Sequence, residues 1–455
     1  MRSTSLRFVI ASQDAHPLAS ASFPEHPFSL PRRRGGVSAA LLLTAFLLAG
    51  GDGVGAANWP AWRGPEGTGV CAEKGLPTRW GPTENVRWKV ALPERGNSTP
   101  IVWGDRIFVT QSVGNDRLLF CFDRRDGRKL WQAGAKDVEK ELTHGTNPYC
   151  AGSPVTDGER VYAAFGSAGL WCFDFEGKEV WHRDLGKQRH IWGNAGSPVL
   201  HGNLCVLNFG PGERTFLIAV DKATGKTVWQ IDEPGGDSGE KRGDAKVAWV
   251  GSWSTPVAMR TEAGEQLVMT FPKQVVGLDP RTGKEVWTSG GINPLVYTSP
   301  IYGDGIVVAM GGFSGMTVAV KMGGSGDVTT SHRVWQHPRT KQRIGSGVIH
   351  DGHVYILNDP GVAECFELKT GRLVWEERLK GQGAKADNWS SLVLADGLLY
   401  GMNQAGDCPV FKASPKFELV SMNPLGEASM SSVAPSNGEL FLRTYKSLWC
   451  IAGKK

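Results

Sequence analysis

Residues 217–230 read LIAVDKATGKTVWQ, and nearly the same string returns twice in the chain. It recurs as VVGLDPRTGKEVWT at 275–288 and as CFELKTGRLVWE at 365–376. Each copy places an apolar run before an acidic residue, a Gly-containing turn and a Trp. Short apolar runs joined through such turns are typical of β-hairpins. The chain therefore repeats one β-rich unit.

The repeated unit has four short strands. Each copy opens with a Ser/Thr-Pro or related Ser step, as in NSTPIVWGDRIFVT at 97–110, and ends at an aromatic residue, as in CFDRRDGRKLW at 121–131. From Trp88 to Phe417 the aromatic residue recurs in seven steps of about 47 residues, a period that indicates a β-propeller rather than a helical array. The intervening aromatic residues are Trp131, Trp181, Trp229, Trp287, Trp335 and Trp375.

The recurring Trp is interpreted as a structural residue. A single blade cannot bury both of its faces, so blades must stack around an axis. A Trp on the outer strand covers a large apolar area of the neighbouring blade and has one N–H to satisfy. The acidic residue accepts backbone N–H groups of the turn, and the Gly takes a positive φ. The predicted docking residues are Trp88, Trp131, Trp181, Trp229, Trp287, Trp335 and Trp375.

The two ends of the repeat predict how the ring closes. The last copy stops after its third strand, at LWCIA (448–452), and an unpaired outer strand around Trp88 precedes the first complete copy. Joining the two removes free sheet edges. The sequence therefore predicts an all-β fold, an eight-bladed β-propeller with four-stranded antiparallel blades. Residues 58–455 are expected to form this single domain.

The N-terminus has the features of a secretory signal. Arg32–Arg34 precede an apolar run at 37–50, and small residues follow at Gly55, Ala56 and Ala57. This order of basic, apolar and small residues is typical of a signal peptide. We expect residues 1–57 to be leader and signal peptide, Asn58 to be the mature start, and the protein to be periplasmic or secreted. An uncleaved membrane anchor is the alternative.

The charge balance argues against a nucleic-acid partner. The formal net charge is only +5 in 455 residues, and no Lys/Arg block follows Arg32–Arg34. Nucleic-acid binding usually needs a clustered basic face. Neither a nucleic-acid partner nor a membrane span after signal cleavage is expected.

The Asp-x-x-Thr-Gly-x-x-x-Trp pattern, as at 221–229, resembles the repeat of pyrroloquinoline-quinone (PQQ) propellers. The resemblance covers residues 59–452, and the start NWPAWRGPEGTG (58–69) is similar to the opening of exported bacterial proteins of this class. One branch of the family contains quinoprotein dehydrogenases of alcohols and sugars. The other contains non-catalytic propellers similar to BamB. The shared pattern predicts the fold and leaves the chemistry open.

The enzymatic branch requires particular residues. The resemblance implies that an alcohol dehydrogenase of this class has two adjacent cysteines, a calcium site of Glu, Asn and Asp, and a catalytic Asp. The chain has no Cys-Cys pair, and its acidic residues, such as Asp237 and Asp387, are scattered. Sugar-oxidising relatives lack the adjacent cysteines. A PQQ- and Ca²⁺-dependent dehydrogenase therefore stays as the alternative; no cofactor, catalytic residue or metal site is expected.

The cysteines are read as small core residues. Cys121, Cys172, Cys365 and Cys450 share one position of the repeat, and equivalent positions of adjacent blades should lie beyond the ~7 Å Cα limit of a disulfide. The spacing predicts no pairing for the other four, which are Cys71, Cys150, Cys205 and Cys408.

A ligand is expected where the loops from each outer strand to the next inner strand gather on one face. Uneven loops on a rigid frame are where binding usually resides. Aromatic, amide and Arg side chains approach the inner strands there, as binding surfaces tend to require. The sequence thus predicts an exported, monomeric, non-catalytic binding or scaffold module for a protein, a peptide or another ligand of the cell envelope, with protein or peptide partners favoured. The candidate binding residues are Tyr149, Trp192, Asn194, Trp253, Tyr297, Arg343 and Trp389.

Overall fold

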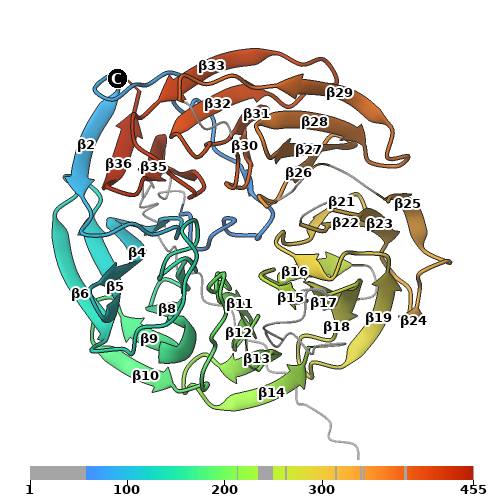
Figure 1. Cartoon of the computed structure of the whole chain (residues 1–455), viewed down its shortest axis with the longest axis horizontal. Helices are drawn as coiled ribbons and strands as arrows, with labels where there is room; N and C mark the ends of the chain where they lie inside the picture. Colours follow the sequence, from blue (N-terminus) through green and yellow to red (C-terminus); the bar gives the residue numbers. More distant parts are fainter. Residues whose placement is uncertain are drawn as a thin grey trace, which may run out of the picture. The chain divides into compact units, whose positions relative to one another are not determined.

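The repeated units fold as four-stranded antiparallel sheets that follow one another around an axis (Figure 1). The computed structural model describes residues 58–453, except 213, 234–249, 262–263, 313–314, 339–340, 342–343 and 384–386. All of these residues belong to one compact unit. The predicted leader and cleavage site at 1–57 lie outside the described residues, and so do Asp237 and Arg343.

The first four blades follow the chain in order. Blade one contains β3 (Ile101–Trp103), β4 (Arg106–Val113), β5 (Asp116–Asp123) and β6 (Lys129–Ala135). Blade two contains β7 (Val155–Thr156), β8 (Arg160–Ala164), β9 (Leu170–Asp174) and β10 (Glu179–Arg183). Blade three contains β11 (Val199–His201), β12 (Leu204–Phe209), β13 (Phe216–Asp221) and β14 (Thr227–Asp232). Blade four contains β16 (Val257–Thr261), β17 (Gly264–Phe271), β18 (Gln274–Leu278) and β19 (Glu285–Gly290).

The next three blades repeat the pattern. Blade five contains β21 (Ile301–Gly303), β22 (Ile306–Met310), β23 (Thr317–Lys321) and β25 (Arg333–His337). Blade six contains β26 (Val348–His350), β27 (His353–Asn358), β28 (Val362–Glu367) and β29 (Leu373–Arg378). Blade seven contains β30 (Val393–Ala395), β31 (Leu398–Tyr400), β32 (Asp407–Lys412) and β33 (Leu419–Pro424).

The eighth blade is built from both ends of the described chain. Its inner strands are β34 (Ala434–Ser436), β35 (Glu439–Arg443) and β36 (Ser447–Ala452), and its outer strand is β2 (Val86–Ala91). Strands β2 and β36 pair antiparallel, with Trp88 opposite Cys450, and they lie side by side in Figure 1. The predicted fold class, an eight-bladed propeller closed by the terminal strands, is confirmed.

A few elements lie outside the four-strand pattern. β1 (Val70–Cys71) adds parallel to the inner strand of blade seven, and β24 (Gly326–Asp327) adds parallel to the outer strand of blade four. β15 (Gly251–Ser252) and β20 (Leu295–Val296) pair with each other. The only helical segment of the described residues is the 3₁₀ turn η1 (Gly166–Ala168), so none of them forms a helix able to cross a membrane.

Each recurring Trp faces a small residue on the third strand of its own blade. A small side chain leaves room for the indole at a cross-strand position, where side chains lie closest. This register explains why only the small residues Cys, Ala and Gly are found opposite the Trp. The pairs are Trp88 with Cys450, Trp131 with Cys121, Trp181 with Cys172, Trp229 with Ala219, Trp287 with Gly277, Trp335 with Ala319 and Trp375 with Cys365.

Six of the seven indole N–H groups donate to a turn carbonyl of the following blade. These turns are the Asp/Gly turns of the repeat, or the corresponding Ser414 turn of blade seven. The contact satisfies the N–H while the ring covers the turn. The acceptors are the carbonyl oxygens of Arg124, Phe175, Lys222, Pro280, Leu368 and Ser414, at 2.7–3.1 Å.

Trp287 is the exception, and the repeat explains why. In blade five a longer connection replaces the short turn of the other blades, and this connection adds β24 to blade four. The indole of Trp287 donates instead to the side-chain oxygen of Gln266 in its own blade, at 2.9 Å. Gly277 opposite is required, because a Cβ there would lie 2.1 Å from the indole nitrogen. Val328 of the connection, 2% exposed, packs in the same core cluster as Trp287.

The Ser/Thr step that opens each unit forms a closed ring of hydrogen bonds. The backbone N–H of each such residue donates to the hydroxyl oxygen of its equivalent in the next blade, at 2.8–3.4 Å. All eight residues are buried. The ring therefore links every blade to both neighbours around the axis. Its members, named the hydroxyl ring below, are Thr99, Ser153, Ser197, Thr255, Ser299, Ser346, Ser391 and Ser432.

Substituting one member of the hydroxyl ring is expected to destabilise the propeller. Ser391→Ala removes the acceptor of the buried Ser346 N–H, so the free energy of unfolding should fall by about 1–3 kcal/mol. The exposed Ser331→Ala is the control, with an expected change within about 0.5 kcal/mol. Denaturant unfolding of both variants measures the difference. Equal stability of the two would show that the ring contributes nothing.

All eight cysteines are free in the structure, and seven of them are buried. Burial raises the pKa of Cys121, Cys172 and Cys365 to about 12. Thiols with a raised pKa are poor nucleophiles. These residues act as small core side chains opposite the Trp residues.

Candidate functional site

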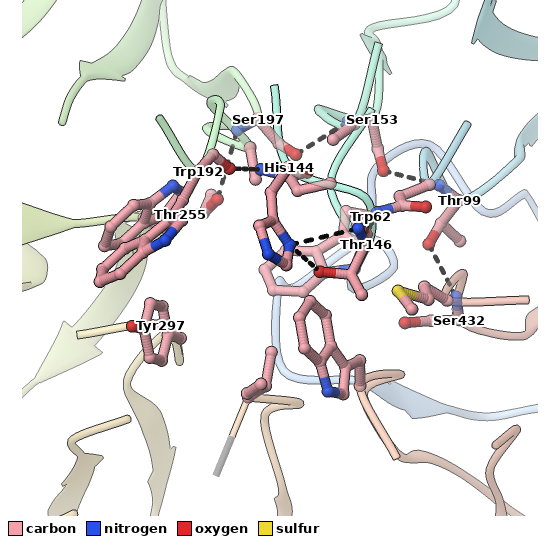
Figure 2. Close-up of a pocket in the computed structure, with 18 residues that line it drawn as sticks. Trp62, Thr99, His144, Thr146, Ser153, Trp192, Ser197, Thr255, Tyr297 and Ser432 are labelled. Atoms are coloured by element: carbon pink, nitrogen blue, oxygen red, sulfur yellow. Dashed lines mark hydrogen bonds between the residues drawn. The ribbon is translucent and has the colours of Figure 1, made fainter. Parts of the chain in front are cut away.

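A cavity of about 290 Å³ lies at one end of the central channel (Figure 2). Its lining comes from the segments that lead into the inner strands of all eight blades. The strand path of a propeller brings these segments together, although they are spread over residues 97–432. The lining residues are Trp62, Asn97, Thr99, His144, Thr146, Asn147, Ala151, Ser153, Trp192, Ala195, Ser197, Trp253, Thr255, Tyr297, Ile344, Trp389, Met430 and Ser432.

One wall of this mouth cavity is a continuous aromatic surface. The rings of Trp192 and Trp253 have centroids 5.9 Å apart, and those of Trp253 and Tyr297 are 5.0 Å apart. Trp253 is only 7% exposed, and its indole N–H donates to the carbonyl oxygen of Gly193 at 2.8 Å. Burial raises the pKa of Tyr297, so its hydroxyl stays protonated at neutral pH. The wall is therefore uncharged and held by packing.

Buried residues support the rings of the aromatic wall from behind. His190 is buried, and its ring contacts the edges of Trp192 and Trp253 at centroid distances of 5.6 and 5.1 Å. Gly312 lies against Tyr297, where any Cβ would meet the phenol ring at 1.9 Å. Close packing of this kind fixes ring orientation, which preorganises a binding surface.

Polar groups face the aromatic wall. The Nδ1 atom of His144 lies 2.7 Å from the hydroxyl of Thr146 and accepts the Thr146 backbone N–H at 3.3 Å. This acceptor role at Nδ1 places the proton of neutral His144 on Nε2. Asn147 is fixed by donating to the carbonyl oxygen of Trp192 at 2.7 Å. Figure 2 shows His144 and Trp62 between the aromatic side and the side formed by Thr99 and Ser432.

The described lining of the mouth cavity contains no Asp, Glu, Lys or Arg. Its side chains are aromatic rings, hydroxyls, amides, one imidazole and the apolar groups of Ala151, Ala195, Ile344 and Met430. A concave, mostly apolar surface with a few polar groups is the usual form of a ligand site. This composition favours a neutral ligand, or the neutral part of a larger one.

The structure brings four of the seven predicted binding residues into this cavity: Trp192, Trp253, Tyr297 and Trp389. Tyr149 and Asn194 instead line a separate cavity of about 50 Å³. The Tyr149 ring lies under the guanidinium of Arg117 at 3.5 Å, and the amide of Asn194 donates to the carbonyl oxygen of Gln188 at 2.8 Å. Both therefore brace the loops behind the wall.

Sequence reasoning did not select Trp62 or Asn97. Trp62 comes from the segment before the first blade. Because it lies outside the repeat, the repeat pattern could not indicate it. Asn97 directly precedes the Ser-Thr-Pro step of blade one, and a related Ser/Thr step opens every unit. Its place next to that step was the available signal.

The described residues do not fit a PQQ and calcium site at this cavity. Calcium takes several oxygen ligands with carboxylates among them, and PQQ carries carboxylates that need cationic partners. The described lining offers neither. Burial and the neighbouring Asp387 raise the pKa of Asp359 to about 6, but neither residue lines the cavity. No three His, Cys, Asp or Glu residues of the described chain are grouped to hold a metal.

Curated relatives share part of this sequence. The outer membrane protein assembly factor BamB of Nitrosomonas eutropha is 24% identical over 245 residues, which are 52% of this chain and 53% of that protein. BamB of Alkalilimnicola ehrlichii is 28% identical over 151 residues, or 31% of this chain and 34% of that protein. The chain thus spans about half of the first relative's length and a third of the second's.

Solved structures share the propeller at low identity. BamB from Moraxella catarrhalis has a TM-score of 0.58 and 16% identity, over 80% of this chain and 96% of that one. Quinohemoprotein alcohol dehydrogenase from Comamonas testosteroni has a TM-score of 0.62 and 12% identity, over 88% and 81%. At these identities the likeness shows the fold alone.

A family model matched to the sequence identifies the family. The model of the family described as "Outer membrane protein assembly factor BamB" matches residues 70–267, 116–331 and 272–407. These overlapping segments follow the repeated blades through most of the chain. The resemblance drawn from the Asp/Gly/Trp repeat is confirmed, and the protein belongs to the BamB family of PQQ-repeat β-propellers.

Proposed function

We propose that this protein is an exported, non-catalytic propeller that binds a protein or peptide of the cell envelope at its mouth cavity. The observation that carries the proposal is the cavity itself, which segments of all eight blades build from aromatic and neutral polar side chains. Aromatic anchors in a preformed hollow are typical of binding hot spots. The partners, the periplasmic or secreted location and the lack of catalysis are parts of this proposal.

Family membership supports the binding role. The relatives that share the sequence pattern are named assembly factors. The alternative, a PQQ-dependent dehydrogenase of alcohols or sugars, rests on the fold shared with quinoproteins. The described lining of the mouth cavity lacks the charged groups that this cofactor and its calcium would require. The binding role is therefore preferred.

Truncating Trp192 or Trp389 is expected to weaken partner binding by tenfold or more, about 1.4 kcal/mol or more. Both side chains are half-buried in the wall of the cavity. Trp171→Ala is the matched control, because Trp171 is half-buried on β9 and does not line the cavity. The partner is captured from envelope extract, identified by mass spectrometry and titrated in pure form against each variant.

The same protein preparation tests the alternative. After incubation with PQQ and Ca²⁺, dye reduction with alcohols and sugars should stay at background. Substrate-dependent dye reduction would overturn the non-catalytic reading. Equal partner affinity of the Trp192→Ala, Trp389→Ala and Trp171→Ala proteins would move the binding site away from the mouth cavity.

A further inference from the structure

Residues 59–71, named the strap here, bind the edges of three inner strands. Trp59 exchanges both backbone hydrogen bonds with Val102 of β3, at 2.8 and 2.9 Å. The carbonyl oxygen of Pro60 accepts the N–H of Thr156 in β7, and that of Gly69 accepts the N–H of Leu394 in β30, each at 2.9 Å. The strap thus pairs with the channel-facing edges of blades one, two and seven.

These three strand residues are equivalent in the repeat. Val102, Thr156 and Leu394 each lie three residues after a member of the hydroxyl ring. An inner strand has a sheet partner on one side only, and alternate residues turn their N–H and C=O groups to the free side. This position therefore presents the backbone groups that the strap uses.

The same position is unpaired in blades three and four. The equivalent residues are Leu200 of β11 and Ala258 of β16. Both hold the same place in the register of their hairpins as Val102, Thr156 and Leu394, and no backbone hydrogen bond from outside the sheet reaches either N–H within the described chain. In blade eight the equivalent residue is Pro435, which has no N–H to satisfy. Blades three and four thus offer the edge groups that the strap satisfies in blades one, two and seven.

Leu200 and Ala258 line one cavity. It measures about 480 Å³ and is bounded by strap residues 60–67 on one side and by β11 and β16 on the other. Trp62 lines this cavity and the mouth cavity, so it lies between the two. The volume is within the usual range of ligand sites, about 300–1,000 Å³.

The strap is a fixed wall of this cavity. The buried guanidinium of Arg63 donates to the carbonyl oxygens of Ser346, Gly347 and Leu392 at 2.6–3.3 Å, and to that of Thr68 at 2.6 Å. These bonds tie the strap to blades six and seven. The strap therefore holds its place without help from blades three and four.

The charged groups of the cavity largely neutralise one another. Arg260 lies 2.8 Å from Glu265, and His201 lies 3.2 Å from the other oxygen of the same carboxylate. Glu66 is the remaining acidic lining residue, and Arg63 is bound to carbonyls. An occupant with an uncharged centre is favoured.

We propose that this cavity binds an extended, centrally uncharged peptide segment of a partner protein, whose main chain pairs with Leu200 and Ala258. The strap is the template for this mode, because it makes the same backbone bonds to Thr156 and Leu394. Adding a strand to a free sheet edge is a common mode of peptide recognition. The proposal is independent of the mouth cavity and its ligand.

The test uses the purified protein and the blocked hexapeptide acetyl-(Thr-Val)₃-amide, whose β-branched residues favour an extended chain. Hydrogen–deuterium exchange is followed in the segments 198–203 and 255–260, and affinity is measured by calorimetry. Saturating peptide is expected to slow exchange at Leu200 and Ala258 at least fivefold. The same peptide with alternate N-methylated amides should bind at least tenfold more weakly, since it cannot donate to the edge C=O groups of Leu200 and Ala258 as Trp59 donates to that of Val102.

The matched protein variants remove the edge donors. The double substitution Leu200→Pro/Ala258→Pro copies what Pro435 already does in blade eight and is expected to lower peptide affinity at least tenfold. Ala258→Ser keeps the N–H and should bind within twofold of the parent. If the proline variant does not fold, the N-methylated peptide decides the question by itself.

Three results would overturn the proposal. They are no saturable protection in either segment, an affinity that the folded double variant leaves unchanged, and equal binding of the N-methylated peptide. Protection confined to the segments around Trp192 and Tyr297 would place the peptide in the mouth cavity instead. That last outcome supports the proposed function while refuting a second site.

Discussion

A chain that lacks residues 84–91 is expected to lose the cooperative unfolding of the propeller. The deletion removes β2, which is the only outer strand of blade eight and pairs with β36 over Val86–Ala91. It also removes Trp88, which is 8% exposed and donates its indole N–H to the carbonyl oxygen of Arg124 in blade one. Loss of a buried Trp alone costs about 3–5 kcal/mol, and the edge of β36 is exposed in addition.

Calorimetry with circular dichroism checks this expectation. The parent should unfold in one sharp transition, and the deleted chain in a broad transition at a much lower temperature. A synthetic peptide of residues 84–91 is the control, because added in excess it should bind the open edge and recover part of the lost stability. A deleted chain that melts like the parent would contradict closure by the terminal strands.

Trp229→Ala is expected to lower the free energy of unfolding by about 3–5 kcal/mol, the usual cost of removing a buried Trp from a core. The Trp229 side chain is 7% exposed, and its N–H donates to the carbonyl oxygen of Pro280 in blade four at 2.8 Å. Its ring also rests on Gly283, where a Cβ would lie 2.6 Å away. The substitution therefore opens a void between blades three and four.

The neighbouring residue provides the control. Val228 is on the same strand and 49% exposed, so Val228→Ala should change stability by less than about 0.5 kcal/mol. Equilibrium unfolding in denaturant compares the two variants under the same conditions. Similar stabilities of Trp229→Ala and Val228→Ala would refute the interpretation of the repeated Trp as a blade-docking residue.

The local repeat in the sequence was enough to predict the fold. The Asp/Gly turn, the small residue opposite the Trp and the regular spacing all act within one unit or between neighbouring units. Strand period and turn chemistry are local properties, so they can be read without coordinates. The incomplete last unit and the unpaired strand at Trp88 likewise allowed ring closure to be predicted, since the hydrogen-bonding groups of a sheet edge must be satisfied.

The binding residues could be predicted only in part from local sequence patterns. Trp192, Trp253, Tyr297 and Trp389 could be selected because the loops before inner strands converge in any propeller. Tyr149 and Asn194 occupy similar positions in the sequence but line a different cavity. Loop length and side-chain direction decide between the two outcomes, and neither follows from the repeat.

What the sequence determined by itself is therefore the eight-bladed ring, its closure and the family, because these follow from contacts between neighbouring units. The tertiary structure decided what lies in the channel. Trp62 and the strap belong to no repeat, and their contacts with Val102, Thr156 and Leu394 join residues far apart in the chain. The hydroxyl ring also closes only when the eighth blade meets the first, where the Ser432 N–H donates to the Thr99 hydroxyl. Non-local contacts of this kind depend on the whole path of the chain, so no local pattern specifies them.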